Sequence, residues 1–532
     1  MKKILLALVI ALMAILVTTG CQKTSAAPAA AGGGAITVEI FDRGMDGGRS
    51  NAADNAWTKW IQEKVKKDLN IDVTFVPVGR WSENTDIVNL MASGSAPDLC
   101  YTYNTEMISQ FRQMGGILDL APYIDQYLPD FKKLLGSDPA FQGQDLVYRD
   151  RDPSTRSVYS VPSVVINNPQ RNMFIRKDWL DALGLPLPTT IQQYYDALVA
   201  FRDNADRLPG SGGSTRVIPY GQDSDARWGF AQIIYAHFDI FVGRQTDRDF
   251  WIQNFSDRPI TVSGYKEGVR LVNRWFNEGL IYNDFPIVTV ADDFFNLLKT
   301  GRVGAYSGNW DHPFRTDNNI NGDLARNVPG AQFVPIDPIA VNGVTYKFVS
   351  DKPGLRIFVP ASSKNPIAAL QYLNWLSKFE NYNFLQTGHA GINHNMVGGV
   401  PQIIAAPAGH EWIQNSANNI DMTIPMNGIE LGSPDLNARV LALGYSGTAP
   451  ELIVQGFSMS TVNGRAPVVY QAATTLDGVY GQTLRDKADA LIAQAVRAPV
   501  AQFDSVWDAG MRDYLQSGAQ EMMDERARLW PR

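Results

Sequence analysis

The pattern of strands and helices over residues 36–103 constrains the fold more than any other feature of the sequence. Apolar and polar residues alternate over 36–40 and again over 71–75, as in half-buried strands. Apolar residues at three- and four-residue steps predict a helix between these strands, a second helix follows over 83–93, and an apolar run over 98–103 is typical of a buried strand. Strand–helix–strand–helix–strand with short connections predicts an α/β fold with a parallel, doubly wound sheet.

Two residues follow the predicted strands at the positions where such sheets bind ligands. Ligands lie beyond the carboxyl ends of the strands, which points to Arg43 after the first strand and Tyr103 after the third. Arg43 suits two forked hydrogen bonds to vicinal hydroxyls or to a uronate carboxylate. The alternative for Arg43 is a structural salt bridge with Asp42 or Asp46.

The rest of the chain is richer in helices. Roughly 500 residues beyond the N-terminal segment exceed a single hydrophobic core, so two lobes are expected. We predict an N-terminal α/β lobe and a C-terminal helix-rich lobe, joined by several chain crossings that form a hinge beside a cleft. The predicted α/β lobe comprises residues 36–160 and 303–362, and the helix-rich lobe comprises residues 161–302 and 363–532.

The N-terminus has the pattern of an export signal. Two lysines precede an apolar run over 4–17, which fits a signal-peptide core and is too short to span a ~30 Å hydrocarbon layer comfortably. Small residues lead into Cys21, as in bacterial lipoproteins, so we predict a signal peptide over 1–20 and lipidation of Cys21. Thr18 stands where lipoprotein signals usually have Leu, so a plain secretory signal is the alternative. Residues 21–35 read as a flexible linker.

Charge and cysteine content exclude some partners. Removing residues 1–20 takes away two lysines and no acid, so the formal charge of −7 becomes −9. A net acidic chain argues against nucleic acid as a partner. After lipidation of Cys21 only Cys100 remains, so no intramolecular disulfide is expected.

Three tryptophans are candidates for a carbohydrate site. Sugars need a flat aromatic face and a few fixed hydrogen-bonding groups, and Trp supplies large apolar area at low entropic cost. Trp310 lies in a Gly/Asn/Pro loop between Asn309 and Asp311, and we predict that all three contact ligand, with Trp228 and Trp81 as further candidates. The alternative for Trp310 is a structural role between the lobes.

No catalytic signature is apparent. Neither Gly-x-Ser-x-Gly nor His-Glu-x-x-His occurs, and His389 and His394 would need unidentified partners to bind zinc. We therefore predict a protein that is not an enzyme and has no cofactor. Because the fold sets the separation of paired carboxylates, a secreted polysaccharide lyase or glycoside hydrolase stays as an alternative.

Four segments, in this order, resemble family 1 extracellular solute-binding proteins, specifically the large lipoprotein branch that serves oligosaccharide and alginate importers. They are residues 91–98 (MASGSAPD), 116–120 (GILDL), 174–190 (FIRKDWLDALGL followed by PTT) and 299–306 (KTGRVGAY). The resemblance implies a two-lobed type II periplasmic-binding fold whose hinge closes on a carbohydrate. It also implies delivery of the ligand to the permease of an ABC transporter. Together with the N-terminal signal, we expect a monomer that is lipid-anchored on the periplasmic or extracellular face of the membrane. A receptor for a peptide or polar small molecule on this fold is a further alternative.

One segment departs from the family pattern. Many relatives carry an acidic calcium loop where this chain has residues 202–213, RDNADRLPGSGG. Calcium takes six to eight oxygen ligands, whereas this segment offers few carboxylates, interrupted by arginines. We predict no metal site.

Overall fold

The computed structural model describes residues 33–530 apart from several internal segments. These segments are 45–50, 137–145, 149–150, 153–154, 167–170, 239–244, 256–257, 316–317, 339–346, 349–352, 414–418, 446, 462–463 and 466–473. The predicted signal peptide, Cys21, residues 22–32 of the linker and Asp46 lie outside the described residues. No helix within the described part of the chain has both the length and the apolar character needed to cross a bilayer.

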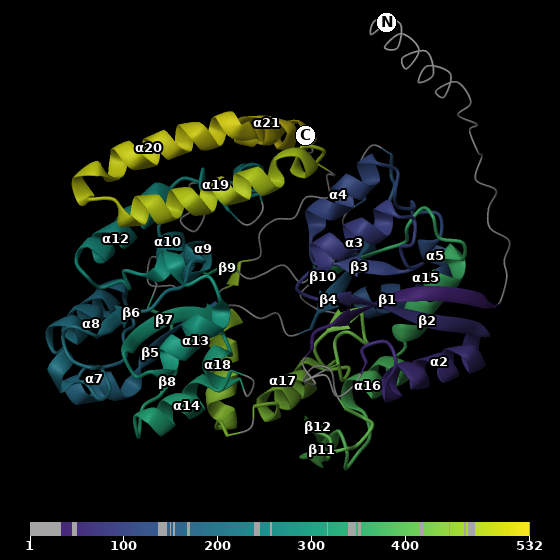
Figure 1. Ribbon diagram of the computed structural model, residues 1–532, viewed down its shortest axis with the longest axis horizontal. Coiled ribbons are helices and arrows are strands. Elements are labelled where there is room, and N and C mark those ends of the chain that lie inside the picture. The colour runs from purple at the N-terminus through teal and green to yellow at the C-terminus, as the bar shows by residue number, and fades with distance from the viewer. Residues whose placement is uncertain are drawn as a thin grey trace, which may run out of the picture.

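The molecule has two lobes, each built around its own sheet (Figure 1). In the first lobe, the parallel pair β1–β2 joins a second sheet of order β13-β4-β10-β3 through a parallel bridge between Val38 and Leu99. Its strands are β1 (Gly34–Asp42), β2 (Ile71–Gly79), β3 (Cys100–Thr102), β4 (Val161–Val165), β10 (Pro353–Phe358) and β13 (Met426–Asn427). Its helices are α2 (Ala56–Leu69), α3 (Glu83–Ala92), α4 (Thr105–Gln113), α5 (Ile124–Tyr127), α6 (Pro129–Gly136), α15 (Pro366–Leu376) and α16 (Phe379–Thr387).

The second lobe packs helices on both faces of a sheet with the order β6-β7-β5-β8. Successive residues of β5 enter different cores, since Met173 and Ile175 lie in one hydrophobic cluster and Phe174 in another. The strands are β5 (Arg171–Arg176), β6 (Ile218–Tyr220), β7 (Val303–Asn309) and β8 (Phe333–Ile336). The helices are α7 (Lys177–Leu183), α8 (Ile191–Asp203), α9 (Ala226–Gly229), α10 (Ala231–Tyr235), α11 (Asp247–Gln253), α12 (Tyr265–Asn277), α13 (Ala291–Lys299), α14 (Ile320–Asn327), α18 (Pro450–Thr461), α19 (Asp477–Arg497), α20 (Phe503–Tyr514) and α21 (Gln520–Leu529).

The chain passes between the lobes more than once. It leaves the first lobe after β4, returns before β10, and leaves again between β13 and α18. Shorter elements flank these crossings: β9 (Lys347–Phe348) pairs with β14 (Gly464–Arg465), and β11 (His394–Val397) pairs with β12 (Val400–Ile403) beside α17 (Pro434–Leu443). Away from the crossings the lobes touch where the side-chain amide of Gln113 on α4 donates to the Thr475 carbonyl, at 2.7 Å, just before α19.

Strand directions bring one edge of each sheet to face the other. In the first sheet β10 is antiparallel to both β3 and β4, so the carboxyl ends of β1, β2, β3 and β4 share one edge. In the second sheet β5 is antiparallel to β7, so the start of β5 lies beside the ends of β6 and β7. The chain passes from the end of β4 to the start of β5, which places these two edges opposite one another.

The observed lobes are divided differently from the predicted boundaries. β7 and β8, within the predicted α/β segment 303–362, belong to the sheet of the second lobe. Helices α15 and α16, within the predicted helix-rich segment 363–532, pack in the core of the first lobe. The reason is that, of the described strands between residues 303 and 362, only β10 pairs in the first sheet, so the chain returns to the first lobe between β8 and β10 rather than at residue 303.

Side chains complete the pairing between β1 and β3. The backbone N–H of Tyr101 donates to the Glu39 carboxyl at 2.9 Å, and the N–H of Phe41 donates to the Tyr101 hydroxyl at 3.0 Å. Glu39 is 1 % exposed, and burial raises the pKa of its carboxyl well above its usual range. The structure therefore favours a neutral carboxyl at this position.

We expect Glu39→Gln to stabilise the protein at higher pH. Because the folded pKa of Glu39 is raised, its stabilising contribution is present below its unfolded pKa of about 4.3 and is lost as pH rises through the folded pKa. Glutamine stays neutral, so the variant should match the wild type near pH ~4 and exceed its melting temperature near pH ~8. Melting curves across this range test the expectation, with Glu63→Gln on the exposed face of α2 as the control. Parallel pH profiles for wild type and Glu39→Gln would contradict it.

Candidate functional site

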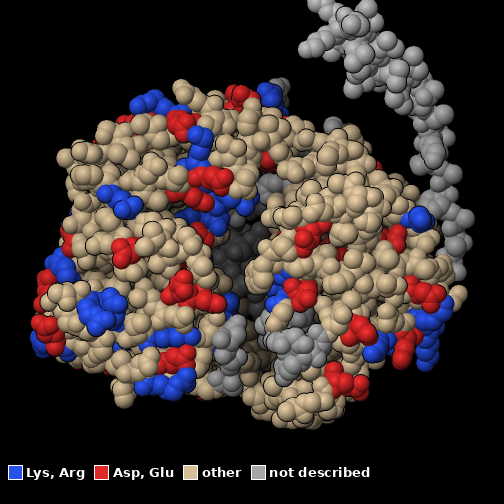
Figure 2. Space-filling model, viewed as in Figure 1, with Lys and Arg blue, Asp and Glu red and all other residues tan. Residues whose placement is uncertain are grey.

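A deep hollow separates the two lobes, and charged side chains of both signs lie along its walls (Figure 2). The facing edges of the two sheets place the ends of β1, β2 and β3 on one wall and the start of β5 with the ends of β6 and β7 on the other. We refer to this hollow as the cleft.

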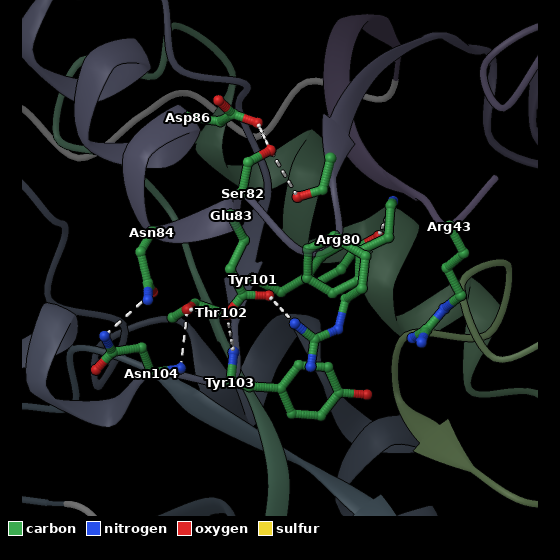
Figure 3. Close-up of polar contacts among 12 residues, drawn as sticks. Arg43, Arg80, Ser82, Glu83, Asn84, Asp86, Tyr101, Thr102, Tyr103 and Asn104 are labelled. Carbon is green, nitrogen blue, oxygen red and sulfur yellow. Dashed lines mark hydrogen bonds and ion pairs between the residues drawn. The ribbon is translucent and has the colours of Figure 1, made fainter. Parts of the chain in front are cut away.

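On the wall of the first lobe, the Arg80 guanidinium lies against the ring of Tyr103 (Figure 3). The Arg80 guanidinium, immediately after β2, lies 4.2 Å from the ring centre of Tyr103, which follows β3, and 5.3 Å from that of Phe41. The rings of Phe41 and Tyr103 are themselves stacked at 6.1 Å. Arg43, after β1, lies 5.9 Å from Phe41. The structure thus places Arg43 and Tyr103 together at the carboxyl edge of the sheet.

Each of these arginines also pairs with a carboxylate. Arg43 Nε donates to Asp421 Oδ2 at 2.6 Å, so its salt bridge is with Asp421 rather than with the predicted neighbour Asp42. Burial raises the pKa of Asp421, although Arg43 opposes this shift. Arg80 Nη1 lies 3.0 Å from Glu83 Oε2. Arg43 Nη2 and Arg80 Nε are buried and make no hydrogen bond within the described part of the chain.

Trp81 is the most accessible aromatic residue of this edge. It follows Arg80 at the end of β2, is 81 % exposed, and has the Arg80 guanidinium 5.1 Å from its ring centre. An exposed indole next to a fixed guanidinium suits stacking against a sugar ring.

On the opposite wall, two arginines share one indole. The guanidinium groups of Arg227 and Arg171 lie 4.3 and 5.1 Å from the ring centre of Trp228 on α9. Arg171 opens β5, and its backbone pairs with Asn309 at the end of β7. The structure therefore brings the predicted residues Trp228 and Asn309 to one edge of the second sheet.

Trp310 and Asp311 lie deeper than the sequence suggested. Trp310 is 2 % exposed, and the rings of Tyr445 and Phe457 pack edge-on against it at 5.6 and 5.3 Å. Asp311 accepts a hydrogen bond from the Tyr445 hydroxyl at 2.8 Å and pairs with Arg315 at 2.9 Å. Contact of Trp310 with a ligand stays a prediction, and in this conformation its ring is covered.

Reasoning from the sequence did not identify several residues of the cleft walls. The rule that located Arg43 and Tyr103 also applies to Arg80, since it follows a predicted parallel strand. Arg171 and Asp421 gave no such signal, because their positions depend on an antiparallel strand and on a pairing across 378 residues.

The segment after α8 does not fit a calcium ion. Within this segment, the Pro209 carbonyl accepts a hydrogen bond from Arg176 Nη2 at 3.2 Å. The other end of the same guanidinium, Nη1, donates to the carbonyl of Gly301, after α13, at 2.8 Å. The Asp203 carboxylate is occupied by Arg202, and one oxygen of Asp206 accepts the Ser214 N–H at 3.3 Å. A guanidinium thus occupies oxygens that a cation would need, which supports the prediction that no calcium binds at this segment.

The fold and the facing strand ends define a ligand-binding protein of the two-lobed periplasmic class. The family model described as bacterial extracellular solute-binding protein matches residues 48–381, and the chain belongs to this family. The family consists of solute-binding proteins, which confirms the predicted family resemblance and the prediction that the chain is not an enzyme.

Individual relatives are distant. The fructooligosaccharide ABC transporter substrate-binding protein FusA of Streptococcus pneumoniae is 24% identical over 50% of this chain and 49% of its own. Lipoprotein LipO of Bacillus subtilis is 24% identical over 42% of this chain and 40% of its own. These matches span half or less of either relative. A crystal structure of an alginate-binding protein without calcium ion is 18% identical, with a TM-score of 0.63 over 94% of this chain and 98% of that one. That likeness confirms the predicted fold class.

We expect chelation to leave stability unchanged. Because Arg176 already bonds the Pro209 carbonyl of the segment after α8 and Arg202 pairs with Asp203, EDTA should not lower the melting temperature and added Ca²⁺ should not raise it. Arg176→Gln serves as the control: it leaves the carbonyls of Pro209 and Gly301 without this donor and should lower the melting temperature. A drop with EDTA that Ca²⁺ reverses would contradict the expectation.

Proposed function

We propose that this protein is the extracellular receptor of an ABC importer and captures a carbohydrate, an oligosaccharide rather than a single sugar, in the cleft. The observation that carries the proposal is the exposed Trp81 ring next to Arg80 and Tyr103, at the shared carboxyl edge of β1, β2 and β3. This arrangement combines an apolar platform with fixed donors, which is what a sugar ring and its hydroxyls require.

The relatives support the carbohydrate class. FusA is named for fructooligosaccharides and the structural neighbour for alginate, both of them saccharides of more than one unit. A cleft with arginines and aromatic rings on both walls can contact several consecutive units. Closure of the lobes then removes water from the ligand, which strengthens hydrogen bonds to its hydroxyls.

The same proposal covers the partners and the location. The extracellular family and the relative named as a lipoprotein support an anchor on Cys21 that holds a monomeric receptor at the outer or periplasmic face of the membrane. Delivery of the ligand to a permease with an associated ATPase follows from the FusA name, which specifies an ABC transporter.

A ligand screen tests the proposal and separates it from a peptide receptor. The protein without residues 1–20 is melted with oligosaccharides, uronates and peptides, each at high excess. A ligand at a hundred times its Kd stabilises the native state by ~2.7 kcal/mol. A rise with a saccharide that chromatography shows intact afterwards supports the receptor. A rise with peptides alone would overturn the carbohydrate class, and degraded saccharide would overturn the receptor.

We expect Trp81→Ala to weaken binding of the saccharide found in this screen by at least about tenfold, or ~1.4 kcal/mol, because the stacking surface is lost. The melting temperature of the free protein should not change, since the side chain is exposed. Val500→Ala, which truncates an exposed residue (58 %) in the 3-10 turn before α20, should alter neither quantity. Unchanged affinity in Trp81→Ala, measured by calorimetry, would remove Trp81 from the site.

A further inference from the structure

Of the four arginines named on the cleft walls, Arg171 forms no ion pair with any acidic residue that the structure describes. Arg43, Arg80 and Arg227 pair with Asp421, Glu83 and Asp225 at 2.6, 3.0 and 3.6 Å respectively. The Arg171 guanidinium makes neither an ion pair nor a side-chain hydrogen bond within the described residues, and Trp228 is the group it contacts.

Arg171 is nonetheless partly withdrawn from water. Its side chain is half-buried, and burial lowers the pKa of its guanidinium, an effect that the more distant Asp225 and Asp223 do not fully offset. Both acids have other contacts: one oxygen of Asp223 accepts from Gln222 and from the Asp225 N–H, and Asp225 faces Arg227. A desolvated cation without an adjacent anion is unfavourable in the free protein, and an incoming anion relieves that cost.

The backbone holds Arg171 in position. It is the first residue of β5, its Cα lies opposite that of Asn309 on β7, and its carbonyl accepts the Gln232 side-chain amide at 2.9 Å. Trp228 holds Arg227 next to it. The two guanidinium groups thus form a cationic pair on a rigid strand and a helix, not on a mobile loop, as a specific anion site requires.

We infer that Arg171, with Arg227 beside it, binds the carboxylate of an acidic sugar, so that the ligand is an oligosaccharide containing a uronate. A guanidinium matches the planar carboxylate with two parallel hydrogen bonds. On the opposite wall, Arg43 and Arg80, which already pair with carboxylates, then contact neutral hydroxyls of the same oligosaccharide. The inference rests on the proposed function, since it specifies the sugar class of that cleft.

The experiment compares each acidic oligosaccharide with the same oligosaccharide after its carboxylates are converted to neutral methyl esters. Calorimetry measures binding of oligogalacturonate, oligomannuronate and oligoglucuronate, each against its fully methyl-esterified form, and of neutral oligosaccharides. We expect one acidic oligomer to bind at least about tenfold more tightly than its ester, with an affinity that falls as salt rises. Equal affinity for acid and ester, or binding of neutral saccharides alone, would overturn the inference and leave the receptor proposal standing. Failure of every saccharide would overturn the carbohydrate proposal itself.

Variants assign the effect to Arg171. Arg171→Gln should remove the preference for acid over ester and leave affinity for the ester unchanged. Arg171→Lys, which keeps the charge without the fork, should retain part of the preference. Arg248→Gln, which removes an exposed arginine paired with Asp249 on α11, should change neither. An undiminished preference in Arg171→Gln would overturn the assignment, and melting curves show that each variant is folded.

Discussion

The passage of the chain from β4 to β5 determines the geometry on which the rest of the molecule depends. β4 ends at the edge of the first sheet where β1, β2 and β3 also end, and β5 begins at the edge of the second sheet where β6 and β7 end. Residues 166–170 are too few to carry the chain around either lobe, since an extended residue spans at most about 3.6 Å. The two edges must therefore face each other, and side chains placed just beyond the strands come together in one cleft without any further device.

Both walls of the cleft use guanidinium groups held on aromatic rings. On one side Arg80 lies over Tyr103, and on the other Arg171 and Arg227 share Trp228. A ring face attracts the cation and limits its rotamers, so less conformational entropy remains to be lost when a ligand binds. Arginine suits this role better than lysine, because its planar group can stack and donate in its own plane at the same time.

The sequence predicted the parts of the site that follow from local pattern. The parallel strands over 36–103 are evident from periodicity, so the rule that ligands bind beyond strand ends locates Arg43 and Tyr103 from the residues alone. The packing of Trp310 was not predictable, because the rings that cover it come from Tyr445 and Phe457, more than a hundred residues away. The lobe boundaries were mistaken for a related reason: β7 and β8 pair with β5 in the second sheet, and nothing in their own composition shows which of two sheets a strand joins.

The distribution of ion pairs over the two walls links ligand charge to closure of the lobes. Apart from the crossings, contacts between the lobes include polar ones such as that of Gln113 with the Thr475 carbonyl, which exchange readily with water. Closing the cleft removes water from every arginine in it. Those paired with carboxylates retain a partner, whereas Arg171 would become a buried charge without one. If Arg171 has the role inferred above, this cost would favour the open arrangement of the empty protein, and a ligand that brings a carboxylate would remove it. Selectivity for an acidic sugar would then arise from the equilibrium between the open and closed arrangements of the lobes.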